Sequence, residues 1–430
     1  MRRNLAPIAI LVVACTSTGG NDTAMSTIEH LSRAETAWRA GAFEAARSAA
    51  EASMAAEPDD LGERRLLVLS SAALGRHEAA VRAFVLGLPA DEALDEAMLW
   101  SHVRLGDPAS ARRYAKSRGL LRNRAIAEQI RLAETRPMRV TAPDLVELPY
   151  AEDALTPFMP GTAAVLNGTP TIVRFDTGGS FVHMTRRQAR YFGVSYAGCE
   201  RGFAGLRFGR MCHGVADFRL GDARFQNVPV SVHPDQTFPS AQVAASFGVD
   251  MGPIIGTNIF GQFLTTFDTP YQRLILSPRG NAAARRRHKA LLVLNGPGTR
   301  VPFGLLGSHH LIARGRLGDR DAVFFVDSGL AAMNDTQGQA TLLMTSSAAG
   351  ASDLSEPRAG RFAEMPWPVG LADRLSAGKT AMIVSERTWR DAGTWQGVRV
   401  DALISYGYLK DFVWTLDFEE RVLVLQEPNG

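Results

Sequence analysis

The pattern of apolar and polar positions changes once along the chain, near Pro137. From about residue 27 to residue 135 the chain is rich in alanine and has a helical pattern, with almost no strand signal. After Pro137, short β-branched and apolar runs are bounded by turn residues, as in strands. The pattern predicts a mainly β fold over residues 138–428, preceded by a small α-helical domain over residues 27–136.

Three similar stretches recur within the helical part, and each contains a glycine. These glycines are Gly41, Gly75 and Gly106, so the spacings are 34 and 31 residues. The stretches resemble tetratricopeptide (TPR) repeats, in which a glycine ends the first helix of each pair and small residues let the second helix pack closely. Two to three repeats fit. The resemblance implies a concave surface for a protein partner; a helical spacer that lifts the β part off a membrane is the alternative.

Two stretches of the β part share one design, a buried strand that ends in a tight turn carrying an aspartate. The first is residues 171–180, TIVRFDTGGS, and the second is residues 322–329, AVFFVDSG. Glycine allows the backbone angles that such a turn needs, and a threonine or serine hydroxyl can bond back to the backbone. One copy could be a turn cap and nothing more. Two copies suggest that the carboxylates of Asp176 and Asp327 are brought face to face.

The segments that follow the two aspartates repeat as well. Phe263 and Phe412 are 149 residues apart, as are Asp268 and Asp417. Asp176 and Asp327 are 151 residues apart. A near-constant offset across three blocks indicates an internal repeat, and therefore two lobes of one design.

Residues 138–427 resemble the pepsin-like and retropepsin-like aspartic proteases. In that family each lobe has an Asp-Thr/Ser-Gly loop, a β-hairpin flap, and an apolar-apolar-Gly segment beneath the catalytic loop, which residues 254–256 match. The resemblance implies a bilobal, acid-protease-like pair of β-barrels, with lobes over residues 138–280 and 290–428. It also implies an aspartic endopeptidase that activates a water through a catalytic dyad of Asp176 and Asp327. The other site residues it implies are Thr177, Gly178, Ser328 and Gly329 beside the dyad, and Phe203, Ala204 and Gly205 in the flap.

The second lobe departs from the family pattern at three positions. Ser405 stands where glycine is usual, and Leu330 and Ala331 replace the small or hydroxylated residues that commonly follow the motif. Two of these departures, Ser405 and Leu330, support an alternative function, a non-catalytic protease-like lipoprotein that binds peptides or cell-envelope partners. A carboxylate pair acting on glycans would leave the hydroxyls and glycines beside both aspartates unexplained.

The N-terminus has the pattern of a bacterial lipoprotein signal. A basic start and a short apolar run occupy residues 1–14, and Cys15 and a polar tether over residues 15–26 follow. This pattern predicts cleavage before Cys15 and lipidation of that residue. An ordinary secretory signal with an incidental cysteine is the alternative. Both imply export, and Thr16 after the cysteine favours an outer-membrane anchor that faces the periplasm.

Two other cysteines remain, Cys199 and Cys212. In an exported protein, two thiols thirteen residues apart suggest a disulfide, at the base of the hairpin that would form the flap. Two buried, reduced cysteines are the alternative.

Charge and composition limit the partners. The net charge of +3 is too small to indicate a nucleic-acid partner, and no later apolar run approaches the length of a membrane span. The adjacent His309 and His310 are poorly spaced for joint metal ligation, and we expect no metal and no cofactor. The basic run at residues 285–289 is interpreted as a solvated linker between the lobes or, alternatively, as a contact for anionic lipid. Residues 348–360 are expected to form a surface loop.

Overall fold

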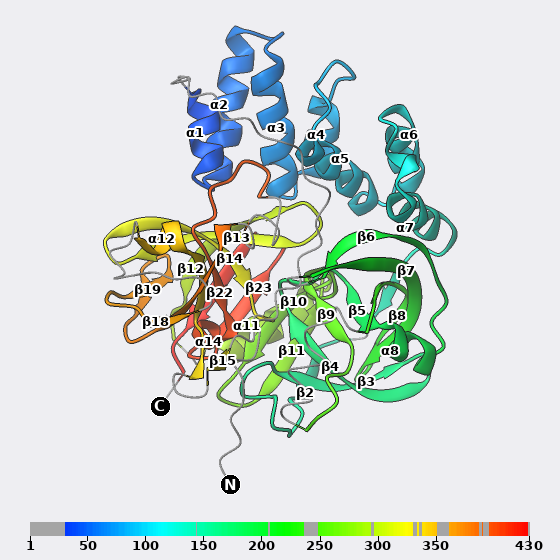
Figure 1. Ribbon diagram of the computed structural model, residues 1–430, viewed down its shortest axis with the longest axis vertical. Helices are drawn as coiled ribbons and strands as arrows, with labels where there is room; N and C mark the ends of the chain where they lie inside the picture. The colour runs from blue at the N-terminus through cyan, green and yellow to red at the C-terminus, as the bar shows by residue number, and fades with distance from the viewer. Residues whose placement is uncertain are drawn as a thin grey trace.

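The structure, a computed structural model, describes residues 31–142, 144–204, 207–235, 248–293, 296–329, 333–334, 338–350, 361–386, 389 and 395–428. An array of helices forms one end of the molecule, and two β lobes form the other (Figure 1). Cys15 and the tether lie outside the described residues, as do Gly205, Leu330, Ala331 and residues 351–360 of the expected loop.

Paired helices make up the N-terminal part, which confirms the predicted helical region. They are α1 (Arg33–Arg39), α2 (Phe43–Ala56), α3 (Leu61–Ala73), α4 (His77–Ala83), α5 (Glu92–Arg104), α6 (Pro108–Ser117), the 3₁₀ turn η1 (Leu120–Arg122) and α7 (Arg124–Thr135). Polar side chains cap the N-termini of several of these helices. Asp60 and Asp91, for example, each accept a hydrogen bond from the backbone N–H group three residues further along the chain. Gly41, Gly75 and Gly106 lie between paired helices with φ of 64°, 76° and 73°, a conformation that favours glycine.

Within the described residues, the first lobe has eight strands, and six of them close into a barrel. Its strands are β1 (Arg139–Thr141), β3 (Gly161–Leu166), β4 (Thr169–Asp176), β5 (Val182–Thr185), β6 (Tyr196–Ala204), β7 (Arg207–Leu220), β8 (Ala223–His233) and β9 (Ile254–Gly256). Pairing runs through β3, β4, β9, β5, β8 and β7 and returns to β3, so these strands form a ring. A short helix, α8 (Arg186–Tyr191), follows β5. The predicted hairpin into the first aspartate is confirmed, because Asn167 and Gly168 form its turn with φ of 47° and 83°.

The second lobe belongs to a sheet of 14 strands that also joins the lobes. Its strands are β2 (Val146–Pro149), β10 (Phe263–Asp268), β11 (Arg273–Pro278), β12 (Thr299–Leu306), β13 (His310–Leu317), β14 (Arg320–Asp327), β17 (Leu342–Thr345), β18 (Phe362–Glu364), β19 (Val369–Leu371), β20 (Arg374–Ser376), β21 (Thr380–Val384), β22 (Ala402–Ser405), β23 (Val413–Asp417) and β24 (Val422–Gln426). Three short helices, α10 (Thr257–Phe260), α12 (Ser346–Gly350) and α14 (Tyr406–Leu409), and a small pair, β15 (Met333–Asn334) with β16 (Gly338–Gln339), complete this part. The mainly β fold is confirmed. Within the described residues, pairing closes a ring in the first lobe and none in the second.

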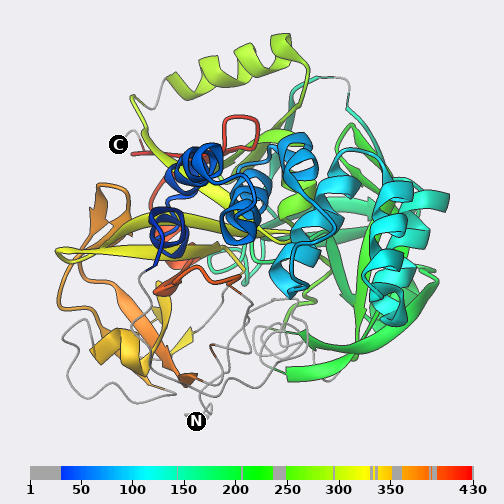
Figure 2. The same ribbon diagram turned by 90° about the horizontal axis from the view of Figure 1, so that it is seen from above.

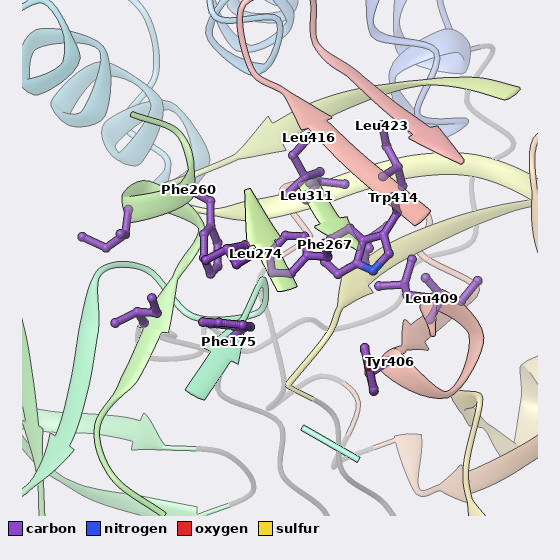
Figure 3. Close-up of a cluster of buried hydrophobic side chains, with 14 of the residues drawn as sticks. Phe175, Phe260, Phe267, Leu274, Leu311, Tyr406, Leu409, Trp414, Leu416 and Leu423 are labelled. Atoms are coloured by element: carbon purple, nitrogen blue, oxygen red, sulfur yellow. The ribbon is translucent and has the colours of Figure 1, made fainter. Parts of the chain in front are cut away.

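The two lobes are joined where the repeated hairpins meet. Strands β10 and β23 pair antiparallel, and Thr266 lies opposite Thr415, with 2.7 Å between their hydroxyl oxygens. The rings of Phe267 and Trp414 stack with their centroids 3.7 Å apart, at the centre of a buried apolar cluster (Figure 3). Equivalent positions of the repeat therefore pack against each other across the lobe junction, and burial of these rings fixes the lobes relative to one another.

The helical array covers one face of the second-lobe sheet. Phe324 and Val326 of β14 point into the core of the lobes, whereas Val323 and Phe325 pack in a second cluster with Trp38 and Phe43 of the array. The view from above shows the helices lying across the β body (Figure 2). A strand buried on both faces is expected to be continuously apolar, which accounts for the run of residues 322–326.

The expected linker between the lobes contains a helix, α11 (Ala282–Val293), visible at the edge of Figure 2. The interpretation of its basic run as a solvated linker holds for Arg286, Arg287 and Lys289, which are exposed, but the run is helical and carboxylates from elsewhere in the chain pair with it. Arg285 pairs with Asp417 at 2.9 Å, and Lys289 pairs with Glu420 at 3.0 Å. His288 within the run is fully buried. Among the residues that the structure describes, none of the helices combines the length and apolar character needed to cross a bilayer.

Candidate active site

The two motif aspartates end equivalent strands. Asp176 is the last residue of β4, which pairs in parallel with β9 so that Asp176 lies opposite Gly256. Asp327 is the last residue of β14, which pairs in parallel with β22 so that Asp327 lies opposite Ser405. Both aspartates are fully buried, with an exposed fraction of 0%.

Reciprocal hydrogen bonds join the two loops. The Thr177 hydroxyl donates to the backbone oxygen of Val326 at 2.9 Å and accepts from the Ser328 N–H, also at 2.9 Å. In the other direction, the Ser328 hydroxyl accepts from the Thr177 N–H at 3.0 Å. Each motif hydroxyl therefore binds the opposite loop, and this exchange fixes the relative orientation of the two turns.

The motif glycines let the carboxyl groups approach the opposite loops. Each carboxyl accepts a hydrogen bond from its own turn: Gly178 N–H donates to Asp176 Oδ1 at 2.7 Å, and Gly329 N–H donates to Asp327 Oδ1 at 3.0 Å. A Cβ added at Gly178 would overlap the Asp327 carboxyl, and one added at Gly329 would overlap the Asp176 carboxyl. Glycine is required at both positions for steric reasons.

The carboxyl groups of Asp176 and Asp327 each lie against the glycine of the opposite loop, so the two acids are close neighbours. Burial raises the pKa of Asp176 to about 6, while its interactions with Asp327 and with the backbone of Gly178, Gly179 and Gly329 act in the opposite direction. Two carboxyls in contact cannot both ionise easily, so the pair holds one proton over a wide pH range. Such a pair can accept a proton from a water and donate one to a carbonyl oxygen.

Ser405 occupies the position that Gly256 holds in the first lobe. Its hydroxyl donates to the backbone oxygen of Ala340 at 2.6 Å and accepts from the Gly407 N–H at 2.9 Å. The departure from glycine is therefore accommodated by hydrogen bonds to neighbouring backbone, and the strand pairing beside Asp327 is the same as that beside Asp176.

A long hairpin stands where the flap is expected. Strands β6 and β7 form it, and Phe203 and Ala204 lie at the end of β6. The predicted disulfide between Cys199 and Cys212 is confirmed, and it crosslinks these two strands. A crosslink at this position limits how far the two strands can separate.

Two buried histidines, His183 and His233, lie next to the Asp176 loop of the first lobe, and the sequence reasoning missed them. His183 Nε2 accepts a hydrogen bond from the Ser180 N–H at 3.0 Å, and His183 Nδ1 lies 3.0 Å from His233 Nε2. Because a backbone N–H can only donate, Nε2 of His183 carries no proton, and its Nδ1–H donates to His233. Burial lowers the pKa of His183 to about 3, so this pair is neutral at pH 7. The spacing of histidines in the sequence gives no signal for this cluster.

A large groove among the described residues lies elsewhere. It has a volume of about 1360 Å³, runs between the helical array and the β lobes, and includes neither Asp176 nor Asp327 among its lining residues. Across the described part of the chain, no group of three or more His, Cys, Asp or Glu side chains has the arrangement needed to hold a metal ion.

Comparisons with known proteins give structural similarities alone. No protein-family model matches the chain, and no curated protein matches its sequence. Among solved structures, a retropepsin-like aspartic protease from Rickettsia conorii is 15% identical over 34% of this chain and 94% of its own, with a TM-score of 0.21. Conglutin gamma, a basic 7S globulin from lupine seeds, is 11% identical over 67% of this chain and 96% of its own, with a TM-score of 0.39. Basic 7S globulin from soybean is 10% identical over 66% and 95%, with a TM-score of 0.37.

Proposed function

We propose that this protein is an aspartic endopeptidase with a bilobal, acid-protease-like body. The close approach of the two buried carboxyls, Asp176 against Gly329 and Asp327 against Gly178, is the observation that carries the proposal. The reciprocal hydrogen bonds of Thr177 and Ser328 support it, because they fix the two aspartate loops relative to each other and leave the carboxyl oxygens free of these bonds.

In this mechanism the dyad acts on a water and a peptide carbonyl together. The ionised carboxyl takes a proton from the water, whose oxygen attacks the carbonyl carbon. The protonated carboxyl donates a hydrogen bond to the carbonyl oxygen and stabilises the tetrahedral intermediate. The peptide binds in an extended form along the β6–β7 hairpin as an added strand. The dyad titrates as a unit, so neither aspartate has a fixed role as acid or base.

Single substitutions of the dyad test this proposal. Asp176→Asn and Asp327→Asn each remove the shared acid, and we expect each to lower kcat for cleavage of unfolded protein substrates by about 10²-fold to 10⁴-fold. Asp319→Asn is the matched control, since the Asp319 side chain is exposed and pairs weakly with Arg316 at 3.4 Å. Circular dichroism and thermal melting establish that the variants fold. Normal cleavage by either dyad variant refutes the mechanism.

A second candidate is a non-catalytic protein with a protease-like body that binds peptides or cell-envelope partners. The complete burial of both aspartates favours it, because a hydrolase needs access for water and substrate. Pepstatin-type compounds separate the two candidates. Inhibition of a measured cleavage supports the enzyme, whereas purified protein that binds peptides and cleaves none supports the binding protein.

We also propose that the protein is exported and anchored by lipid at Cys15, with the TPR-like array available to a protein partner. The basis is the N-terminal signal pattern, and the proposed location is the outer membrane, facing the periplasm. Metabolic labelling with an alkyne fatty acid tests the anchor: the wild-type protein should be labelled and Cys15→Ser should not. Equal labelling of both proteins contradicts the lipoprotein assignment.

A further inference from the structure

The large groove between the helical array and the β lobes is lined by aromatic, basic and acidic side chains. Trp100 of α5 and Phe181 of the first lobe both line it and lie beside each other, with ring centroids 6.1 Å apart. Phe418 of the second lobe also lines it. The volume of about 1360 Å³ exceeds the roughly 300–1,000 Å³ of ordinary small-molecule pockets. The groove therefore has the size and the aromatic surface for a peptide.

One end of this groove is strongly basic. Arg104, Arg279 and Arg421 all line it, together with His77. Burial and the neighbouring charges of Arg104 and Arg279 lower the pKa of Arg421 to about 9. The same three guanidinium groups add to the effect of burial on His77 and lower its pKa to about 3. The three arginines are thus close enough to repel one another.

Two of the three arginines have compensating partners. Arg104 donates to the backbone oxygen of Ser308 at 2.7 Å and is stabilised by the charge of Glu96. Arg279 lies 3.6 Å from Glu419 and donates to the backbone oxygen of Gly261. Both groups therefore have a nearby carboxylate.

Among the residues that the structure describes, no carboxylate pairs with Arg421. Its Nη1 is enclosed and, within the described residues, has no hydrogen-bond partner. Its guanidinium lies over the ring of Phe303, 6.0 Å from the centroid. Leaving a buried charged group unpaired is unfavourable, and an anion in the groove would remove that cost.

The backbone does not require an arginine at this position. Arg421 lies in the turn between β23 and β24, and Gln272 lies at the equivalent place between β10 and β11, 149 residues earlier. Their φ angles are 55° and 48°, so the two turns have the same conformation. Gly75 of the array lies against the guanidinium, and a Cβ there would overlap it. The arginine occupies space that the helical array leaves open.

The N-terminal part of α5 makes a second stretch of the groove acidic. Glu92, Asp95 and Glu96 line it. Burial and the neighbouring carboxylates raise the pKa of Glu92 to about 7. This stretch disfavours a ligand that is acidic along its whole length. It favours a ligand with one carboxylate at the arginine end and neutral or basic groups beyond it.

We propose that this groove binds the C-terminal end of a peptide, whose free carboxylate pairs with Arg421. The preceding residues lie against Trp100 and Phe181, and extend toward Glu92 and Glu96. This binding uses none of the dyad residues and does not depend on proteolysis. An arginine suits the role because its planar fork of N–H groups can bind a carboxylate through two parallel hydrogen bonds.

The test measures binding of a fluorescent decapeptide by anisotropy. The peptide has neutral and basic residues and a free C-terminus, and its C-terminal amide is the matched probe. All proteins are full-length and carry Asp176→Asn, so that no peptide is consumed. Arg421→Gln copies the residue that the chain uses at the equivalent turn. Arg286→Gln removes the same charge from an exposed site outside the groove and is the control.

We expect Arg421→Gln to raise the Kd for the free-acid peptide about tenfold or more, since a hydrogen bond to a charged group has that effect. Arg286→Gln should leave the Kd unchanged, and the amide should bind to the parent protein about as weakly as the free acid binds to Arg421→Gln. Thermal melting establishes that Arg421→Gln is folded; if it is not, Arg279→Gln at the partly exposed neighbouring arginine is used in its place. Equal Kd values for the free acid and the amide, or an unchanged Kd in a folded variant, overturn the proposal.

Discussion

His310 gives the clearest quantitative prediction. Its imidazole is 1% exposed and is enclosed by aromatic rings, with centroids 5.1 Å from Phe325 and 5.8 Å from Trp395. Within the described residues, neither ring nitrogen has a hydrogen-bond partner. The perturbation is His310→Phe, which keeps an aromatic ring of similar size and removes the ionisable group.

Burial lowers the pKa of His310 to about 4 in the folded protein, below its ordinary value of 6.5. For a base with a lowered pKa, the unfolded chain takes up the proton first as pH falls. The stability is therefore complete above pH 6.5 and decreases as the pH falls toward 4. At pH 5 this single histidine lowers the free energy of unfolding by about 2 kcal/mol relative to pH 8. In His310→Phe this acid-induced loss of unfolding free energy is absent.

The assay is urea unfolding at pH 8 and pH 5, followed by tryptophan fluorescence. The difference in unfolding free energy between the two pH values should be about 2 kcal/mol smaller in His310→Phe than in the wild-type protein. The variant should also be somewhat more stable at pH 8, because two unpaired polar atoms are removed from the interior.

An identical pH dependence in the two proteins would refute this reasoning, since it would mean that His310 titrates normally in the folded state. A second histidine provides a comparison. Burial lowers the pKa of His288 to about 3, but its ring nitrogens lie 3.0 Å from Ser277 Oγ and 2.8 Å from Thr266 Oγ1. His288→Phe should reduce the acid sensitivity as well, but at pH 8 it should destabilise, because it leaves both hydroxyls without this partner.

Three further predictions follow from the site and the core. If the dyad is catalytic, kcat/KM should fall about tenfold per pH unit as pH rises above about 6, because the shared proton at Asp176 is lost; a flat profile to pH 8 contradicts this. Replacing Cys199 and Cys212 together by serine should lower stability by about 3 kcal/mol, since the bridge closes a loop with a sequence separation of 13; an unchanged melting curve contradicts it. Trp414→Ala should cost about 3–5 kcal/mol in urea unfolding because the ring is fully buried against Phe267, whereas Tyr271→Ala, at a residue 66% exposed, should cost less than about 1 kcal/mol; similar losses would contradict the packing argument.

Local patterns and the internal repeat made much of the fold predictable. The turn at Asn167 and Gly168 follows from a two-residue signal, and the equivalence of the strands that end at Asp176 and Asp327 follows from repeated spacing. The run of residues 322–326 is a further local signal. Five consecutive apolar residues without alternation indicate burial on both faces, and the second face is the one that the helices cover.

Long-range contacts explain what the sequence did not reveal. The ion pairs of the basic run of α11 could not be predicted because Asp417 and Glu420, which pair with it, lie more than 125 residues further along the chain. The hydrogen bond between His183 and His233 spans 50 residues and has no spacing that a pattern could detect. The position of the Arg421 guanidinium against Gly75 depends on how the array packs on the β23–β24 turn, and no local sequence pattern predicts that packing.

The packing of the helices on the second-lobe sheet has a practical consequence. Ile312, Val323 and Leu343 belong to the β body, yet they share one buried apolar cluster with residues of the array. An expression fragment that begins after residue 137 would expose these side chains to water and would be prone to self-association. A relative without the array would need polar substitutions on this face, so the identity of these three positions in any shorter homologue would indicate whether it once carried the same helices.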